Sequence, residues 1–197
     1  MLFDSLTNEE IVDSESALEF MKEATKLASS ADLEDISERV SRKAECFKEH
    51  LCPSSVDELD ENNFDRIVSL IFSIGRKSKR LIDANGFENL RNMIRDLLHG
   101  DDPVEDRFSL FVNQVEGIEE KMRINFAGEL LHYSMPDRYW LWTNWIWDPD
   151  NNTGALPLVV QEEVDLLGET EGETYLRVGE AMSYVNQVGK EHGYSRV

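Results

Sequence analysis

Apolar residues recur every three or four positions through most of this chain, and this spacing places them on one face of successive α-helices. The stripes begin near Ser14, Asp32, Asn62, Phe87, Val104 and Ile118, and a last one runs from Thr174 to Lys190. The stripe from Asn62 extends to Gly75, residues 137–157 lack the period, and Val159 to Leu167 fits either a short helix or a strand. We therefore expect an all-α fold, a bundle of about six to eight helices with an irregular tryptophan-rich segment before the C-terminal helix.

The length of 197 residues fits one helical domain, residues 1–197, in which an N-terminal helical pair, residues 1–53, packs on residues 60–197. No apolar run is long enough for a membrane span, and Met1 to Asp4 lacks the basic start of a signal peptide. The two cysteines are too few for a disulfide framework. These features predict a cytoplasmic protein with no membrane contact.

Acidic residues outnumber basic ones by 40 to 20, giving a net charge of -20. Residues 1–60 hold 16 acidic and 6 basic groups, residues 61–100 hold 5 and 7, and residues 101–197 hold 19 and 7. The negative electrostatic field of this net charge disfavours nucleic acid as the main partner and favours a protein with a basic surface. The exception is a run of four cations that can meet phosphate or an acidic partner, or form a solvated helix end: Arg76, Lys77, Lys79 and Arg80.

All four tryptophans lie between Tyr139 and Asp148, at Trp140, Trp142, Trp145 and Trp147. Indole rings bury large areas and seek a hydrogen-bond partner, so this cluster can form part of a core, a ligand pocket or a contact surface for another protein. We predict that these four residues, together with Arg138, bind a partner, and the core remains the alternative.

The segment after the tryptophans places oxygen-bearing side chains at every second position, in Asp148, Asp150 and Asn152. Calcium loops present their ligands in this way, but an EF-hand needs Gly and Glu where this chain has Thr153 and Val159. A turn that bonds its own backbone is the alternative to a calcium loop.

Two segments repeat a carboxylate followed three positions later by histidine: Asp96 with His99, and Glu129 with His132. Di-iron carboxylate bundles use this spacing, which predicts an iron site and oxidative chemistry. Alternatively, each histidine lies near a helix C-terminus, where its charge complements the helix dipole.

The order Leu130-Leu131-His132-Tyr133, Pro136-Asp137-Arg138-Tyr139 and a later Tyr175-Leu176 resembles a helical segment of bacterial proteins related to helix-hairpin-helix DNA glycosylases. The resemblance covers about residues 126–190 and implies an α-helical fold. The Leu-Pro-Gly-x-Gly hairpin of those enzymes is missing, and their lysine and aspartate have no counterpart that can be placed. No activity is carried over.

No Walker loop, Gly-x-Ser-x-Gly elbow or Gly-x-Gly-x-x-Gly motif is present. We therefore expect a protein without enzymatic activity or cofactor, an adaptor, assembly factor or regulator that acts through contacts with a basic partner. An oxidative metal protein and a nucleic-acid-associated helical domain are the alternatives.

Overall fold

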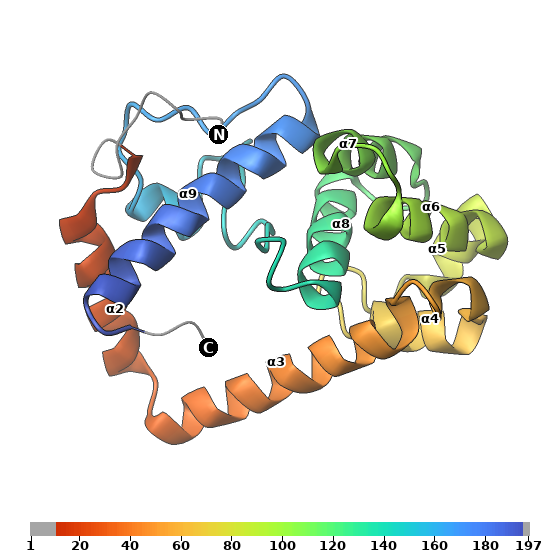
Figure 1. The fold of residues 1–197 in the computed structure, drawn as a ribbon, viewed down its shortest axis with the longest axis horizontal. Coiled ribbons are helices and arrows are strands. Elements are labelled where there is room, and N and C mark those ends of the chain that lie inside the picture. The colour runs from red at the N-terminus through yellow and green to blue at the C-terminus, as the bar shows by residue number, and fades with distance from the viewer. Residues whose placement is uncertain (1–10, 195–197) are drawn as a thin grey trace.

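The computed structural model describes residues 11–194, and α-helices make up most of its regular structure (Figure 1). Its α-helices are α2 (Ser14–Leu27), α3 (Ser30–Leu51), α4 (Glu61–Ser69), α5 (Ser78–Asn85), α6 (Phe87–His99), α7 (Val104–Gln114), α8 (Glu120–Ser134) and α9 (Glu171–Glu191). Two short 3₁₀ turns, Val56–Glu58 and Leu156–Leu158, complete the regular structure. The expected all-α fold is confirmed. Residues 1–10, including Met1 to Asp4, lie outside the described residues.

The first two helices join the rest of the chain at separate places. Helix α2 packs against α9, whereas α3 packs against α8 and α4. Figure 1 shows α3 running along one side of the molecule, from the α2 end to the α4 end. A capping box between Ser29 and Asp32 starts α3, because the Ser29 hydroxyl accepts from the Asp32 amide and the Asp32 carboxylate accepts from the Ser29 amide.

Stacked aromatic rings join α7, α9 and the tryptophan-rich segment. Phe108 lies 4.5 Å from Tyr175 and 5.8 Å from Trp142, measured between ring centroids. The backbone of α8 also lies very close to the backbone of this segment, since a Cβ at Gly128 would lie 2.2 Å from the carbonyl oxygen of Trp142. Only glycine fits between α8 and this segment.

The apolar stripe of α3 is buried at one end and exposed at the other. Phe47 is fully buried and meets the ring of Tyr133 edge to face. The same stripe continues toward the N-terminal end of the helix, where Leu33, Ile36 and Val40 are 38–45% exposed. Among the described residues, the apolar side of the first half of α3 is therefore only partly covered.

Two expected elements differ from the structure. The helix predicted to reach Gly75 ends at Ser69, and the chain continues in turns until α5 begins at Ser78. Residues 159–167 form neither a helix nor a strand but a turn with one isolated bridge, between Val160 and Val12. In both places apolar residues are buried by an irregular backbone, which periodicity alone does not distinguish from a helix.

Candidate ligand pocket

A pocket of about 430 Å³ lies where α3, α6 and α8 all end. The helix ends contribute Leu51 and Cys52 from α3, Leu98, His99 and Gly100 from α6, and Ser134 and Met135 from α8. The rest of the lining consists of Lys48, Pro53, Arg107, Arg138 and Tyr139.

Local sequence signals explain why the three helices stop here. Cys52 and Met135 each precede a proline, and proline disfavours helical geometry in the residue before it. Both have left the helical region, with ψ angles of 161° and 66°. Helix α6 stops at Gly100, where a Cβ would lie 2.6 Å from the Asp96 carbonyl oxygen. Each end is encoded locally, and tertiary packing brings the three ends together.

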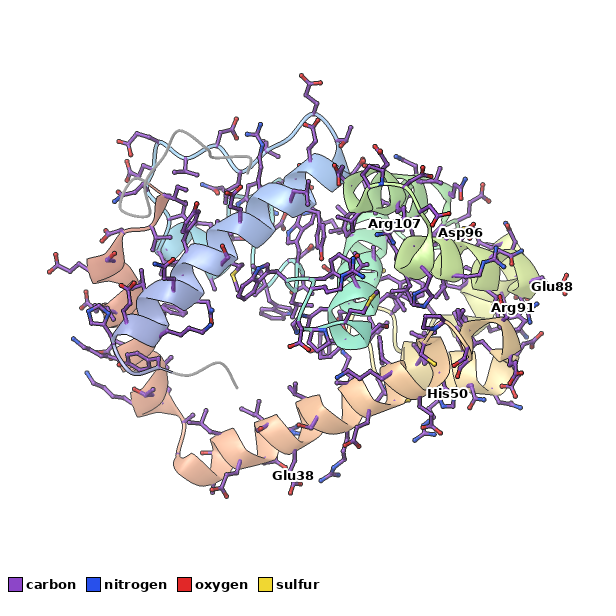
Figure 2. The ribbon with its side chains drawn as sticks, viewed as in Figure 1. Glu38, His50, Glu88, Arg91, Asp96 and Arg107 are labelled. Carbon is purple, nitrogen blue, oxygen red and sulfur yellow. The ribbon has the colours of Figure 1, made fainter. Side chains whose placement is uncertain are left out.

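The guanidinium group of Arg107 bonds only to neutral oxygens. Its Nε donates to the Asp102 carbonyl at 2.8 Å, its Nη2 reaches the Tyr139 hydroxyl at 3.2 Å, and its Nη1 donates to the Leu97 carbonyl. Figure 2 shows Arg107 near α6, from which the Leu97 carbonyl comes. Its positive charge is therefore fixed at the pocket without being neutralised.

Two further cations, Lys48 and Arg138, are exposed at the pocket. The Arg138 guanidinium carbon lies 5.3 Å from the centroid of the Tyr139 ring, a cation–π arrangement that orients the side chain. Within residues 11–194, neither cation lies within ion-pair distance of a carboxylate, and no aspartate or glutamate lines the pocket.

The cations have to be weighed against the helix ends, because each helix C-terminus carries about half a negative charge. Three such ends amount to roughly -1.5, against three full positive charges from Lys48, Arg107 and Arg138. The sum stays positive. In a chain of net charge -20, this pocket is locally suited to an anion.

Three further groups can contact a ligand in the pocket. His99 shares a hydrogen bond of 2.7 Å with the Leu51 carbonyl, and since a carbonyl only accepts, Nε2 carries the proton. The hydroxyl of Ser134 is buried without a hydrogen-bond partner. Side-chain hydrogen bonds from the Ser54 and Ser55 hydroxyls lower the pKa of Cys52 to about 7. The thiol is therefore partly ionised at neutral pH.

The tryptophans predicted to bind a partner separate into two groups. Trp142 and Trp147 are 1% and 4% exposed and stack on each other, so their assignment to a contact surface is corrected: they belong to the core. Their indole N–H groups donate to the Trp147 carbonyl and to the side-chain oxygen of Asn152. Trp145 is 75% exposed and Trp140 is half-buried, so these two can still contact a partner.

The predicted metal ligands are not brought together. Glu129 is buried and paired with Lys43, whereas Asp96 is exposed and paired with Arg95. Figure 2 shows the position of Asp96 on α6. His132 Nδ1 lies 2.9 Å from the Tyr139 carbonyl. In the part of the chain that the structure describes, no three His, Cys, Asp or Glu side chains form a group able to hold a metal ion. The helical spacing is present, but the two pairs have other partners.

A lysine occupies the centre of the predicted calcium loop. Lys121 Nζ lies 2.8 Å from both carboxylate oxygens of Asp148 and 3.0 Å from Asp150. Hydrogen bonds from Lys121 and from the Asn151 amide lower the pKa of Asp148. The loop thus has a cation of its own chain where the calcium hypothesis places an ion, and Asn152 accepts from an indole instead.

Comparison with known proteins identifies no relative, since no protein family, no curated protein and no solved structure matches this chain. The resemblance to helix-hairpin-helix DNA glycosylases therefore stays a prediction. None of the helices among residues 11–194 is both long enough and apolar enough to cross a membrane.

Sequence reasoning missed most of the pocket. Arg138 was singled out, but for the tryptophan segment, and Lys48, Arg107 and Ser134 were not singled out at all. One usable signal existed: Pro53, Gly100 and Pro136 each end a helix, and cations lie within a few residues of two of these stops. The sequence contains no indication that the three stops meet.

Proposed function

We propose that the protein binds a small organic anion in the pocket at the ends of α3, α6 and α8. The main observation behind this proposal is that Lys48, Arg107 and Arg138 line the pocket together, whereas no carboxylate lines it. An anion there would offset the repulsion among three like charges, and the interaction is strengthened by the partial exclusion of solvent.

The lining also indicates what the ligand carries besides its charge. Leu51, Leu98, Met135 and the ring of Tyr139 offer an apolar surface, and the Ser134 hydroxyl offers an unused donor. A volume of about 430 Å³ lies within the usual range for small-molecule sites. The ligand class is therefore a carboxylate or phosphate attached to an apolar or aromatic body.

Titration calorimetry with phenyl phosphate, and with benzyl alcohol as its neutral analogue, tests this proposal. We expect the phosphate to bind and the alcohol not to bind. The double variant Lys48→Gln/Arg138→Gln should weaken phosphate binding at least tenfold, about 1.4 kcal/mol. Both side chains are exposed, so the variant should fold normally.

The matched control is Arg39→Gln/Arg42→Gln, which removes two exposed cations of α3 that do not line the pocket. It should leave binding unchanged. Equal binding by both double variants, or equal binding of phosphate and alcohol, would show that the pocket is not an anion site.

The ionisation of Cys52 gives a second test. A thiolate adds a negative charge at the pocket, so its formation should lower the affinity for an anion of fixed charge as pH rises through about 7. Cys52→Ser should reduce this dependence, because the variant has no thiol to ionise near neutral pH. An unchanged pH profile in Cys52→Ser would separate Cys52 from the site.

Action through contacts with a basic partner stays a prediction, as do the cytoplasmic location and the oxidative and nucleic-acid-associated alternatives. Trp145 and Trp140 are the members of the predicted tryptophan anchor that a partner can still reach.

A further inference from the structure

A short turn between α4 and α5 presents one aromatic side chain to solvent. Phe72 is 87% exposed, whereas Ile71 before it and Ile74 after it are fully buried. Large exposed apolar side chains are ordinary when scattered, but Phe72 is held outward between two buried anchors. The position of the ring is thus set by the fold.

Backbone hydrogen bonds keep this turn in one conformation. Ile71 donates to Val68, Ile74 donates to Ile71, and Lys77 donates to Ile74, at 2.8–3.1 Å. At Gly75 a Cβ would lie 3.2 Å from the Ser69 carbonyl oxygen, closer than usual contact. The turn is therefore tightly packed on the end of α4, and a partner would meet a preformed surface.

Two cations share a hollow with the ring, and two more follow them in sequence. Arg76 and Lys77 line the same hollow of about 440 Å³ as Phe72, and Lys79 and Arg80 follow in the first turn of α5. None of the four has an ion-pair partner within residues 11–194, although acidic residues outnumber basic ones two to one in the chain. The same hollow contains Ser73, whose buried hydroxyl has no hydrogen-bond partner.

We infer that this surface, Phe72 with Arg76, Lys77, Lys79 and Arg80, docks an acidic segment of a partner protein that carries at least one apolar side chain. Carboxylates would pair with the cations, and the apolar side chain would cover Phe72. The partner inferred here is opposite in charge to the basic partner that the net charge suggests, because residues 61–100 are the one segment of the three counted that carries a positive balance.

A nucleic acid would also offer negative charge and rings to stack on Phe72, but the rest of the molecule disfavours it. A strand extends its charge well past the patch, over surfaces where acidic residues dominate. A short acidic segment confines its charge to the patch. Repulsion from the remaining surface is screened beyond about 8 Å at physiological salt, so it affects the long polymer more than the short segment.

Fluorescence anisotropy with a labelled synthetic peptide of alternating Glu and Leu tests the inference. The comparison probes are the same peptide with Gln in place of Glu, and a single-stranded thymidine oligonucleotide of equal length. We expect the acidic peptide to bind the full-length protein at least tenfold more tightly than either comparison probe, and less tightly at high salt.

Two variants locate the binding. Phe72→Ala and the quadruple change of Arg76, Lys77, Lys79 and Arg80 to Gln should each weaken acidic-peptide binding at least tenfold. The matched controls are Leu110→Ala, an exposed apolar residue on α7, and the quadruple Gln change of the exposed Lys22, Lys26, Arg39 and Arg42. The second control removes the same net charge from α2 and α3.

Equal weakening by both quadruple variants would assign the effect to net charge and overturn the inference. Equal binding of the Glu and Gln peptides would do the same. Tighter binding of the oligonucleotide, lost in Phe72→Ala, would replace the acidic protein segment with a nucleic acid. Circular dichroism shows whether each of the two variants is folded. If one of them has misfolded, the loss of binding is judged from the other variant alone, so misfolding cannot imitate the expected result.

Discussion

The buried pair of Lys43 and Glu129 links α3 to α8, and replacing Lys43 by Met should destabilise the protein in a pH-dependent way. The two side chains are 15% and 9% exposed. Burial raises the pKa of the Glu129 carboxyl, and the charge of Lys43 opposes this. The Lys43 ammonium also lies 4.2 Å from the centroid of the Tyr133 ring.

The magnitude follows from leaving a carboxylate buried without its counter-ion, which costs about 3–5 kcal/mol. The lost cation–π contact adds roughly 0.5–1 kcal/mol. Arg42→Met provides the control, because Arg42 is the residue before Lys43 on the same helix and its side chain is 70% exposed. Its loss should cost less than about 1 kcal/mol.

The sign of the pH dependence is set by the raised pKa. The pKa of Glu129 is raised in the folded state above its ordinary value of 4.5. The folded protein therefore becomes less stable as pH rises from 4.5 toward the folded-state pKa of this carboxyl. Without Lys43, the pKa of Glu129 is raised further, because the ammonium charge no longer opposes the effect of burial. The deficit of Lys43→Met relative to wild type should therefore be full near pH 8 and shrink toward pH 4.5, where the carboxyl becomes neutral.

Urea unfolding followed by circular dichroism at both pH values measures the deficit. In the double variant Lys43→Met/Glu129→Met no buried charge remains, and stability at pH 8 should return to within about 1 kcal/mol of wild type. A deficit that is the same at both pH values, or a double variant as unstable as the single one, would refute the reasoning.

Three further predictions concern the tryptophan-rich segment and the cysteines. Gly128→Ala should cost more than about 2 kcal/mol in urea unfolding, since the new Cβ would lie 2.2 Å from the carbonyl oxygen of Trp142; a neutral effect would mean that the segment can move away. Trp142→Ala should cost about 3–5 kcal/mol and Trp145→Ala less than about 1, and similar costs would contradict their different burial. Iodoacetamide should alkylate Cys52 with a rate that is half-maximal near pH 7, whereas burial raises the pKa of Cys46 and keeps it unreactive; mass spectrometry identifies the labelled residue, and faster labelling of Cys46 would reverse the assignment.

Local signals predicted much of the fold because several helices end at a proline or glycine that is visible in the sequence. Pro53 and Gly100 end helices as expected, and the apolar spacing around Ile94 identifies the buried face of α6. The secondary structure just before the basic run was harder to predict, because the turn before α5 buries Ile71 and Ile74 at a spacing that a helix would also give.

Long-range pairing could not be predicted in the same way. Lys43 and Glu129 are 86 positions apart, and nothing near Glu129 in sequence indicates that an ammonium group, and not a metal, would meet its carboxylate. Lys121 likewise comes from α8 to bind Asp148 in the tryptophan-rich segment. Both errors about metals have this origin, since a carboxylate pattern identifies acceptors but not the cation that they receive.

The position of the tryptophans has a practical consequence for spectroscopy. All four indoles belong to one stretch of eight residues, so intrinsic fluorescence reports the packing of that stretch and not of α2 or the exposed half of α3. Within this signal, Trp145 is open to a soluble quencher such as acrylamide, whereas Trp142 and Trp147 are shielded. Fluorescence and circular dichroism thus observe different parts of the same molecule, and unfolding of the N-terminal helices before the rest would be visible only by circular dichroism.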